Sequence, residues 1–596
     1  MVAKARELLT GVEDVLVEAP PVTGEPEVFG LADVVPGIPT ATATKEDESY
    51  KWTVLGNATL GILMASINSS ILLISLPAIF LGIKIDPLTP GASGFLLWIL
   101  MGYMVATAVL LVTFGRISDM FGRVKMYNLG FAIFTLGSIL LVFTPGSGTF
   151  AATALLVLRL VQGVGGAFLF ANSTALITDA FPANRRGMAM GVSQIAFTVG
   201  SLGGLLIGGL LAAIDWRLVF LVSVPFGIVG AIWAYLSLHE TTVPRRGQRL
   251  DIWGNLAFGI GLTVLLVGVT YGIEPYGGSS MGWGNPLVIG AIAFGLLLLA
   301  AFVYIENRVK DPLFHLDLFK NRMFVAGNIS GFVASLARGG LQFMLIIWLQ
   351  GIWLPLHGFS FESTPVWAGI YTAPMIVGFV VTGPLSGTLS DRYGARMFAT
   401  GAMLLTALSF VLLTFLPGDF NRWVFFVLLL LMGLSMGLFA APNTTSIMNA
   451  VPANQRGVAS GMRGTFQNAG TMASIAFFFS ILTAGLASSL PGVMSAGLIA
   501  NGLSAAVAHH IAALPPISVL FAAFLGYNPM RTLIPHTVVQ HLSTHTQNVL
   551  FGHTFFPQLI LPAFISSLHI AFYLSAGLAV IAAAASFFRG ERIIVE

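Results

Sequence analysis

The sequence predicts an all-α membrane protein with fourteen transmembrane helices: two six-helix bundles, two inserted helices between them, and both termini in the cytoplasm. Of its 596 residues, 56% are hydrophobic and 9% are charged, whereas about a quarter of the residues in soluble proteins are charged. Apolar stretches of the roughly 20 residues that cross a bilayer as a helix recur along the chain. Two short phrases also repeat at nearly one offset, which indicates a duplicated bundle.

The apolar windows give the order of the elements. Residues 1–50 are acidic and Pro-rich and hold no apolar stretch of signal-peptide length, so we expect a disordered cytoplasmic tail. The predicted spans lie at 53–81, 94–114, 126–144, 150–178, 188–212, 217–238, 253–273, 286–305, 324–354, 367–386, 397–416, 423–447, 458–484 and 558–587. The predicted domains after the tail are an N-terminal six-helix bundle (51–240), a linker with two inserted spans (241–320), the first five helices of a C-terminal bundle (321–484), an extracytoplasmic insertion (485–557), and the last span with a cytoplasmic end (558–596).

The basic residues orient these spans. Of the 28 lysines and arginines, 21 fall in the tail and in loops on the same side as the N-terminus, and four fall on the opposite side. Because Lys and Arg are retained in cytoplasmic loops, both termini are expected inside. The same rule keeps the Pro-rich insertion 485–557 outside, on the membrane surface or capping the bundle, with 492–513 as an interfacial or re-entrant piece.

Two phrases recur in the two bundles. GRISDMFGR, ending at Arg123, is echoed by GTLSDRYGAR, and FPANRRG at 181–187 is echoed by VPANQRG at 451–457, 270 residues later. We therefore expect Asp119 and Asp391 at the same face of the membrane. In transporters built from such repeats, the substrate site lies between the halves near the midplane, and rocking of the halves alternates access to it.

The first repeated phrase matches the loop 2–3 signature G-x-L-x-D-R-x-G-R-R of the major facilitator superfamily, although Met120 and Val124 replace basic positions. Over roughly residues 53–480 the sequence resembles the fourteen-span drug:proton antiporter branch of that superfamily, which is known for multidrug efflux. The resemblance implies the major facilitator fold and a loop that latches the two halves on the cytoplasmic side. The residues expected to form this conformational latch are Gly115, Asp119, Gly122, Arg123, Asp391 and Arg392.

Arg159, Gln162 and Gly163 match the R-x-x-Q-G signature of the family in span 4. A charge inside a span is costly and marks a candidate functional site, and the resemblance implies a role in coupling. The alternative is a structural arginine that is paired with carbonyls and polar side chains.

Three glycines, Gly200, Gly204 and Gly208, are spaced four apart in span 5 and resemble the glycine-rich antiporter motif of the family. Leu205 stands where that motif has proline, which weakens the inference of antiport. Small residues at this spacing also serve close helix packing.

Inside the predicted spans, the deep charges are cationic. Asn68 occupies a span 1 position that is normally Asp in the resembled branch, and no Asp or Glu lies deep in any predicted span. The deep charged residues are Arg159 and Arg338, and Arg463 lies less deep in span 13. His569 in span 14 carries a titratable imidazole, and the alternative is that it is a neutral, packed histidine. The expected coupling and cavity residues are Asn68, Tyr103, Arg159, Gln162, Arg338 and His569.

The missing carboxylate shapes the functional hypothesis. A proton-coupled exporter of cations needs a titratable acid in its cavity, so we expect a secondary active exporter of neutral or anionic amphiphiles, either lipophilic small molecules or lipids. It would work by alternating access in the plasma membrane, and proton coupling stays open. Two alternatives also remain: a metabolite uptake permease of the same superfamily, and a non-transporting sensor with the same fold.

Other classes fit poorly. The GLSMG phrase at 433–437 matches a serine-hydrolase elbow but lies inside a predicted span, and no Walker A motif is present. We therefore expect no enzyme activity, no cofactor, no metal site and no nucleic-acid partner. The expected partners are the lipophilic substrate, the lipid bilayer and, if coupled, protons, with the protein acting as a monomer.

Overall fold

The computed structural model describes residues 45–590 except 87–88, 90–91, 183–184, 241–250, 310–311, 313, 315, 362, 453–454, 526–527 and 529. The chain divides into two units, Met1–Tyr50 and Lys51–Glu596, and the second contains the helical bundle. Most of the predicted tail, residues 1–44, lies outside the described residues. Residues 45–50 differ from the prediction of disorder because they form the first turns of a long helix.

Fourteen helices of the described chain are long and apolar enough to cross a membrane, which confirms the predicted number of spans. The first six spans are built from α2 (Lys45–Gly82), α3 (Ala92–Phe121), α4 (Arg123–Val142), α5 (Gly148–Ala180), α6 (Arg186–Ala212), and α7 with α8 (Leu218–Leu221, Ser223–Ser237). The inserted pair is α9 (Ile252–Tyr271) and α10 (Pro286–Glu306). These two helices pack against each other, and only 17% of the apolar window of α10 is buried, so most of that helix is left for lipid.

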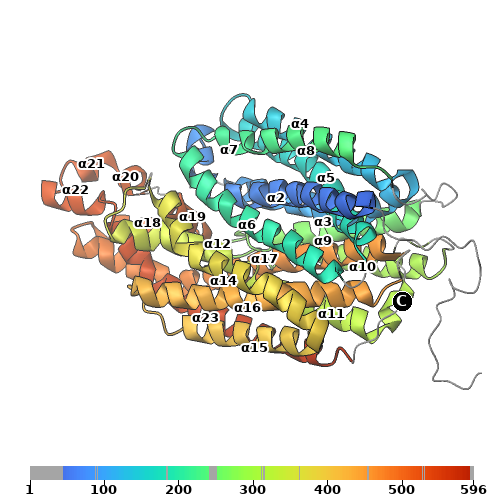
Figure 1. Ribbon diagram of the computed structural model, residues 1–596. Helices are drawn as coiled ribbons and strands as arrows, with labels where there is room; N and C mark the ends of the chain where they lie inside the picture. Colours follow the sequence, from blue (N-terminus) through green and yellow to red (C-terminus); the bar gives the residue numbers. More distant parts are fainter. Residues whose placement is uncertain are drawn as a thin grey trace, which may run out of the picture. The chain divides into compact units, whose positions relative to one another are not determined.

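The second half follows the same plan with one irregular span. It comprises η2 (Leu316–Lys320), α11 (Arg322–Arg338), α12 (Leu341–Ile346), η3 (Ile347–Trp353), α13 (Leu354–Leu356), α14 (Thr364–Tyr393), α15 (Ala395–Leu413), α16 (Arg422–Asn449), α17 (Arg456–Ala500) and α23 (Phe555–Phe587). Segments α11 to α13 form one span, of which η3 is a π-helical part. Figure 1 shows α2 and α4–α8 on one side and α14–α16 with α23 on the other.

The two copies of the repeated phrase lie at the same end of the bundle. At one end of α6, a Cβ on Gly209 would lie 3.0 Å from the Pro365 carbonyl carbon, while a Cβ on Gly383 would lie 3.8 Å from Ile195 Cγ1. Helices α6 and α14 therefore run antiparallel, and the last turn of α14, with Asp391, lies near the start of α6. The first copy lies at the junction of α3 and α4, where Arg123 forms an ion pair with Asp179 near the end of α5. Because α6 follows α5 directly, the first copy also lies near the start of α6.

The predicted insertion begins later than expected. Helix α17 continues without a break through Pro491 to Ala500, and its 45 residues span about 68 Å at 1.5 Å per residue, well beyond a hydrocarbon core of about 30 Å. The stretch 492–513 thus supplies the last turns of α17 and the next short helix. Leu490, Met494 and Leu498 are buried in this extension, which explains why the helix continues.

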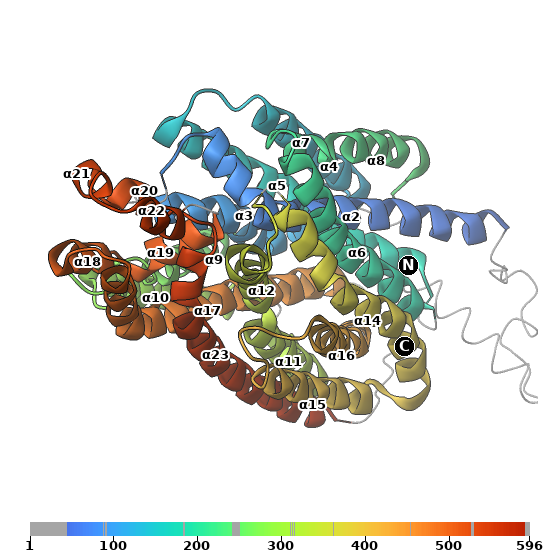
Figure 2. The same ribbon diagram turned by 90° about the vertical axis from the view of Figure 1, so that its left-hand side faces the viewer.

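Five short helices follow the extension and gather at one end of the bundle (Figure 2). They are α18 (Ala505–Ala512), α19 (Pro516–Phe524), α20 (Met530–Leu533), α21 (His536–Val539) and α22 (Thr544–Leu550). Helix α19 contacts η3 and α17 of the second half and α3 of the first. The Phe521 ring lies 5.4 Å from that of Phe479. The insertion therefore joins the two halves at this end.

Candidate substrate cavity and buried charge clusters

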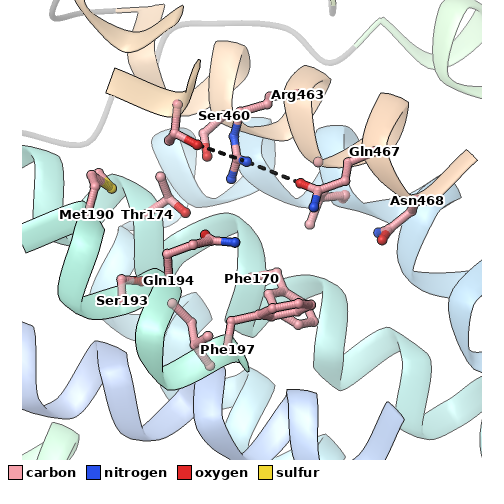
Figure 3. A pocket seen from close by; sticks show the side chains of 14 residues that line it. Phe170, Thr174, Met190, Ser193, Gln194, Phe197, Ser460, Arg463, Gln467 and Asn468 are labelled. Atoms are coloured by element: carbon pink, nitrogen blue, oxygen red, sulfur yellow. Dashed lines mark hydrogen bonds between the residues drawn. The ribbon is translucent and has the colours of Figure 1, made fainter. Parts of the chain in front are cut away.

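A cavity of about 80 Å³ lies between the two halves. Its wall is formed by α2, α3, α5 and α6 of the first half and by α16 and α17 of the second. Figure 3 shows Arg463 and Gln467 on one side of it and Gln194, Phe170 and Phe197 on the other. A site between repeats is what the duplicated sequence predicts.

A second cavity of about 30 Å³ adjoins the first and is lined mainly by α11, α16 and α17. The two cavities share Gln194, Thr444, Arg463 and Gln467. Arg338 lines the second cavity from the end of α11. The structure thus brings together two arginines that are 125 positions apart in the chain.

The two cavity arginines are poorly partnered. Arg463 Nη1 lies 3.2 Å from Gln467 Oε1 and 3.5 Å from Thr444 Oγ1, and its Nε has no hydrogen-bond partner in the described part of the chain. Arg338 Nη1 is also buried without a partner among the described residues. Each guanidinium therefore keeps hydrogen-bonding capacity for another acceptor.

The charge of the cavity is one-sided. Among the described lining residues of both cavities there is no Asp or Glu, and both arginines belong to the second half. The first half contributes the neutral polar groups of Thr174, Ser193 and Gln194 and two phenylalanines. This arrangement favours an anionic group at the second half and an apolar group at the first.

Four of the predicted cavity residues form a separate cluster inside the first half. Arg159 Nη1 donates to Asn68 Oδ1 and to Gln162 Oε1, the latter at 2.6 Å. Gln162 Nε2 donates to Ser138 Oγ at 2.8 Å, and the Arg159 guanidinium lies 4.8 Å from the centre of the Tyr103 ring. The side chains of this cluster are buried and line neither cavity. Arg159 therefore has the polar partners expected of a structural arginine, while Arg338 reaches the cavity.

His569, the sixth predicted cavity residue, lies elsewhere. Its Nε2 is 3.3 Å from the Leu416 carbonyl oxygen, just beyond the end of α15. It lines neither cavity between the halves.

The predicted latch residues of the first copy bind one another within one half. Arg123 Nε donates to Asp119 Oδ1 at 2.8 Å, and Arg123 Nη1 pairs with Asp179. These contacts join α3, α4 and α5. In the second copy, Arg392 is exposed and the side chain of Asp391 lies outside the described residues. A contact of the latch across the two halves stays a prediction.

Glu240, which follows α8, binds the start of α4 next to these residues. Glu240 accepts hydrogen bonds from the backbone N–H groups of Arg123, Val124 and Lys125, at 3.0 to 3.2 Å. It thereby caps the N-terminus of α4, where a negative charge is favourable. Gly122 has φ +110°, and a Cβ there would lie 2.4 Å from Glu240 Oε1. The second glycine of the motif is thus required by both its backbone conformation and its carboxylate neighbour.

The glycine series on α6 packs against α2. A Cβ on Gly200 would lie 2.1 Å from Ser66 Oγ, one on Gly204 would lie 2.6 Å from the Ile67 carbonyl oxygen, and one on Gly208 would lie 2.7 Å from Ile71 Cγ1. The series therefore allows two helix backbones to approach closely.

A buried arginine at the end of α23 was not expected from the sequence. Arg589 is only 2% exposed and donates to Asn443 Oδ1, and Asn443 Nδ2 donates to the Gly327 carbonyl at 3.2 Å. Burial lowers the pKa of Arg589 to about 10, so it remains a cation at neutral pH. Because it follows the last span, its sequence position indicated only a cytoplasmic loop charge.

Comparisons with known proteins agree with this architecture. The sequence profile described as Major Facilitator Superfamily matches residues 58–475. The riboflavin transporter RibZ of Clostridioides difficile (strain 630) is 28% identical over 438 residues, which cover 73% of this chain and 89% of that protein. Multidrug resistance protein 3 of Bacillus subtilis (strain 168) is 25% identical over 443 residues, covering 74% and 81%.

Two further similarities concern an export protein and a solved structure. The tetracenomycin C resistance and export protein of Streptomyces glaucescens is 27% identical over 420 residues, covering 70% of this chain and 73% of that protein. A bacterial homologue of the human lysosomal transporter Spinster, in an inward-facing and unoccupied conformation, has a TM-score of 0.53 at 15% identity. The alignment covers 91% of this chain and 99% of that one, and it supports the fold alone.

Proposed function

Because the chain belongs to the Major Facilitator Superfamily, we propose that it exports amphiphilic small molecules or lipids of anionic or neutral character by alternating access. Membership of this family makes the chain a transporter rather than an enzyme, and a multi-pass protein of the plasma membrane. The substrate class and the direction of transport are the proposal.

The cavity arginines carry this proposal. Arg338 and Arg463 face the same cavity with unpartnered guanidinium nitrogens, and the described lining holds no acid. A substrate anion would accept charge-assisted hydrogen bonds there, which are about twice as strong as neutral ones. A cationic substrate would meet two like charges in a site of low dielectric constant, where repulsion is strong.

The opposite wall supports an apolar substrate body. Phe170, Phe197 and Ile62 of the first half line the cavity, and aromatic faces suit an amphiphile whose head is bound at the other half. The present cavity of about 80 Å³ is far smaller than the roughly 300 to 1,000 Å³ of sites for drug-sized ligands. Substrate entry therefore requires the halves to separate.

The names of two relatives point to different substrates, because one is a riboflavin transporter and the other a multidrug resistance protein. They therefore do not select one substrate class for this chain. We infer that this chain differs from a cation exporter through Asn68, which leaves Arg159 without a carboxylate partner in the described structure.

A flux assay with two matched dyes tests the proposal. Purified protein in vesicles would be assayed with carboxyfluorescein, which is anionic, and with rhodamine 6G, which has a related ring system and is cationic. We expect protein-dependent movement of the anionic dye. The variants Arg338→Gln and Arg463→Gln should each reduce it by about tenfold or more, because each removes a charge-assisted hydrogen bond.

The exposed Arg308 offers a matched control, because Arg308→Gln removes the same charge far from the cavity. This variant should transport the anionic dye at the wild-type rate. Transport of rhodamine 6G alone, or of carboxyfluorescein at an unchanged rate in both cavity variants, would contradict the proposed substrate class.

A further inference from the structure

The two cavities between the halves contain uncompensated charge. Arg338 and Arg463 both line the smaller cavity, and no acidic partner of either is present in the described part of the chain. A buried cation without a counter-charge is costly even after relaxation and water penetration. In this structure both arginines are half-buried. Closing both sides of the transporter around an empty cavity would bury them fully and is therefore unfavourable.

Arg159 shows how the same charge is accommodated elsewhere in the molecule. Its Nη1 donates to Asn68 and Gln162, and its guanidinium lies over the Tyr103 ring. Neutral dipoles and an aromatic face thus meet that cation within the first half, although its Nε has no partner among the described residues. At the cavity, Arg463 has two long or moderate contacts with neutral oxygens, and Arg338 Nη1 has none among the described residues. The cavity arginines are left to be neutralised by something that enters.

The size of the cavity selects the kind of ligand. A volume of about 80 Å³, with about 30 Å³ adjoining it, holds several water-sized groups, since one water needs roughly 10 to 15 Å³ on this measure. An amphiphile needs far more space. A single small inorganic anion fits this volume, and the side-chain amide of Gln194 lines the same space as a further donor.

We propose that a small inorganic anion, chloride in the first instance, binds between Arg338 and Arg463 when the amphiphile is absent, and that the protein exchanges the two anions across the membrane. This inference rests on the proposed function, because it names the counter-substrate of the same site. The amphiphile neutralises the arginines in one direction and chloride does so on return. Transport is then coupled through shared occupancy of the arginines, with no titratable acid in the cavity.

The test uses carboxyfluorescein-loaded vesicles containing the full-length protein. The external medium holds either chloride or gluconate at equal ionic strength, with the membrane potential clamped at zero. Gluconate is a six-carbon anion too large for a cavity of this volume. We expect dye efflux to be faster by about tenfold or more into chloride than into gluconate, and an outward dye gradient to drive uptake of radioactive chloride.

Variants and outcomes separate this inference from the proposed function. Arg338→Gln and Arg463→Gln should lose the dependence on external chloride, whereas Arg308→Gln should keep it. Dye efflux at equal rates into chloride and gluconate, without chloride uptake, would overturn the exchange and leave amphiphile transport standing. If thermal melting shows that the purified protein is folded and no protein-dependent dye movement occurs in any medium, both the exchange and the proposed function are overturned.

Discussion

At the scale of single residues, the buried arginines differ in how their charge is met. Arg159 is surrounded by neutral dipoles and an aromatic face, Arg123 by two carboxylates, and Arg589 by one amide oxygen. The cavity pair meets neutral groups alone: Arg463 contacts Gln467 and Thr444, and Arg338 Nη1 has no partner among the described residues. The energy of a buried cation depends on such partners, so these arginines should respond differently to substitution.

Asn68 tests the structural part of this account. Asn68→Leu removes an acceptor from Arg159 and should lower the free energy of unfolding by about 2 kcal/mol, the usual value of a hydrogen bond to a charged group. Asn68→Asp supplies a carboxylate at the same place and should retain the wild-type melting temperature or raise it. Thermal melting of the purified variants in one detergent measures both. Equal melting temperatures for Asn68→Leu and the wild type would show that this contact contributes little.

The sequence singled out Asn68, Tyr103, Arg159 and Gln162 as coupling or cavity residues because their motifs resemble those of the family, and that role stays a prediction. It did not predict that these residues are sealed inside one half. Arg463 was not among the expected cavity residues, and Glu240 and Asn443 were not singled out. Their roles depend on helices that meet only in the folded chain, and neither hydropathy nor local spacing records which face of a helix meets the other half.

At the scale of helices, the packing of α6 on α2 depends on missing side chains. Gly204→Ala places a Cβ against the Ile67 carbonyl oxygen, whereas a Cβ on Gly203 meets nothing within 4 Å. We expect Gly204→Ala to lower the free energy of unfolding by about 1–3 kcal/mol through overpacking.

Gly203→Ala is the matched control, and it should leave the melting temperature unchanged or raise it slightly, because alanine favours the helix. Thermal melting of both variants in the same detergent is the measurement. A larger loss for Gly203→Ala than for Gly204→Ala would contradict the observed face of α6.

Most helices follow from hydropathy, and the exceptions have local causes. Helix α17 passes the predicted end at 484 because apolar residues beyond that point, Leu490, Met494 and Leu498, are buried. The π-helical segment η3 interrupts the α-helical hydrogen bonding of one long span, and its seven residues are all buried. Hydropathy predicts neither feature, because it does not distinguish an apolar residue that is buried in protein from one that faces lipid.

At the scale of the whole chain, the repeated phrases carried the most information. A constant offset of about 270 residues predicted two equivalent halves. Thr174 and Thr444, which stand at that offset, both line the cavity between the halves. The charges break this equivalence, because the second half alone supplies the cavity arginines. An exchanger of amphiphilic anions can use such asymmetry to orient its substrate.

The central claim is that the two halves tilt against each other around this cavity. The chain has no cysteine, so pairs of spin labels can be placed at introduced cysteines alone. Phe121 and Tyr393 are exposed at corresponding helix ends near the repeated phrases, and Phe143 and Phe415 are exposed at the opposite ends of α4 and α15.

The decisive measurement is the pair of distances Phe121→Cys to Tyr393→Cys and Phe143→Cys to Phe415→Cys, recorded by pulsed electron paramagnetic resonance with and without carboxyfluorescein. Alternating access predicts that the two distances change in opposite senses, one lengthening as the other shortens. Two distances that stay constant, or that lengthen together, under conditions in which the dye is transported would contradict the account.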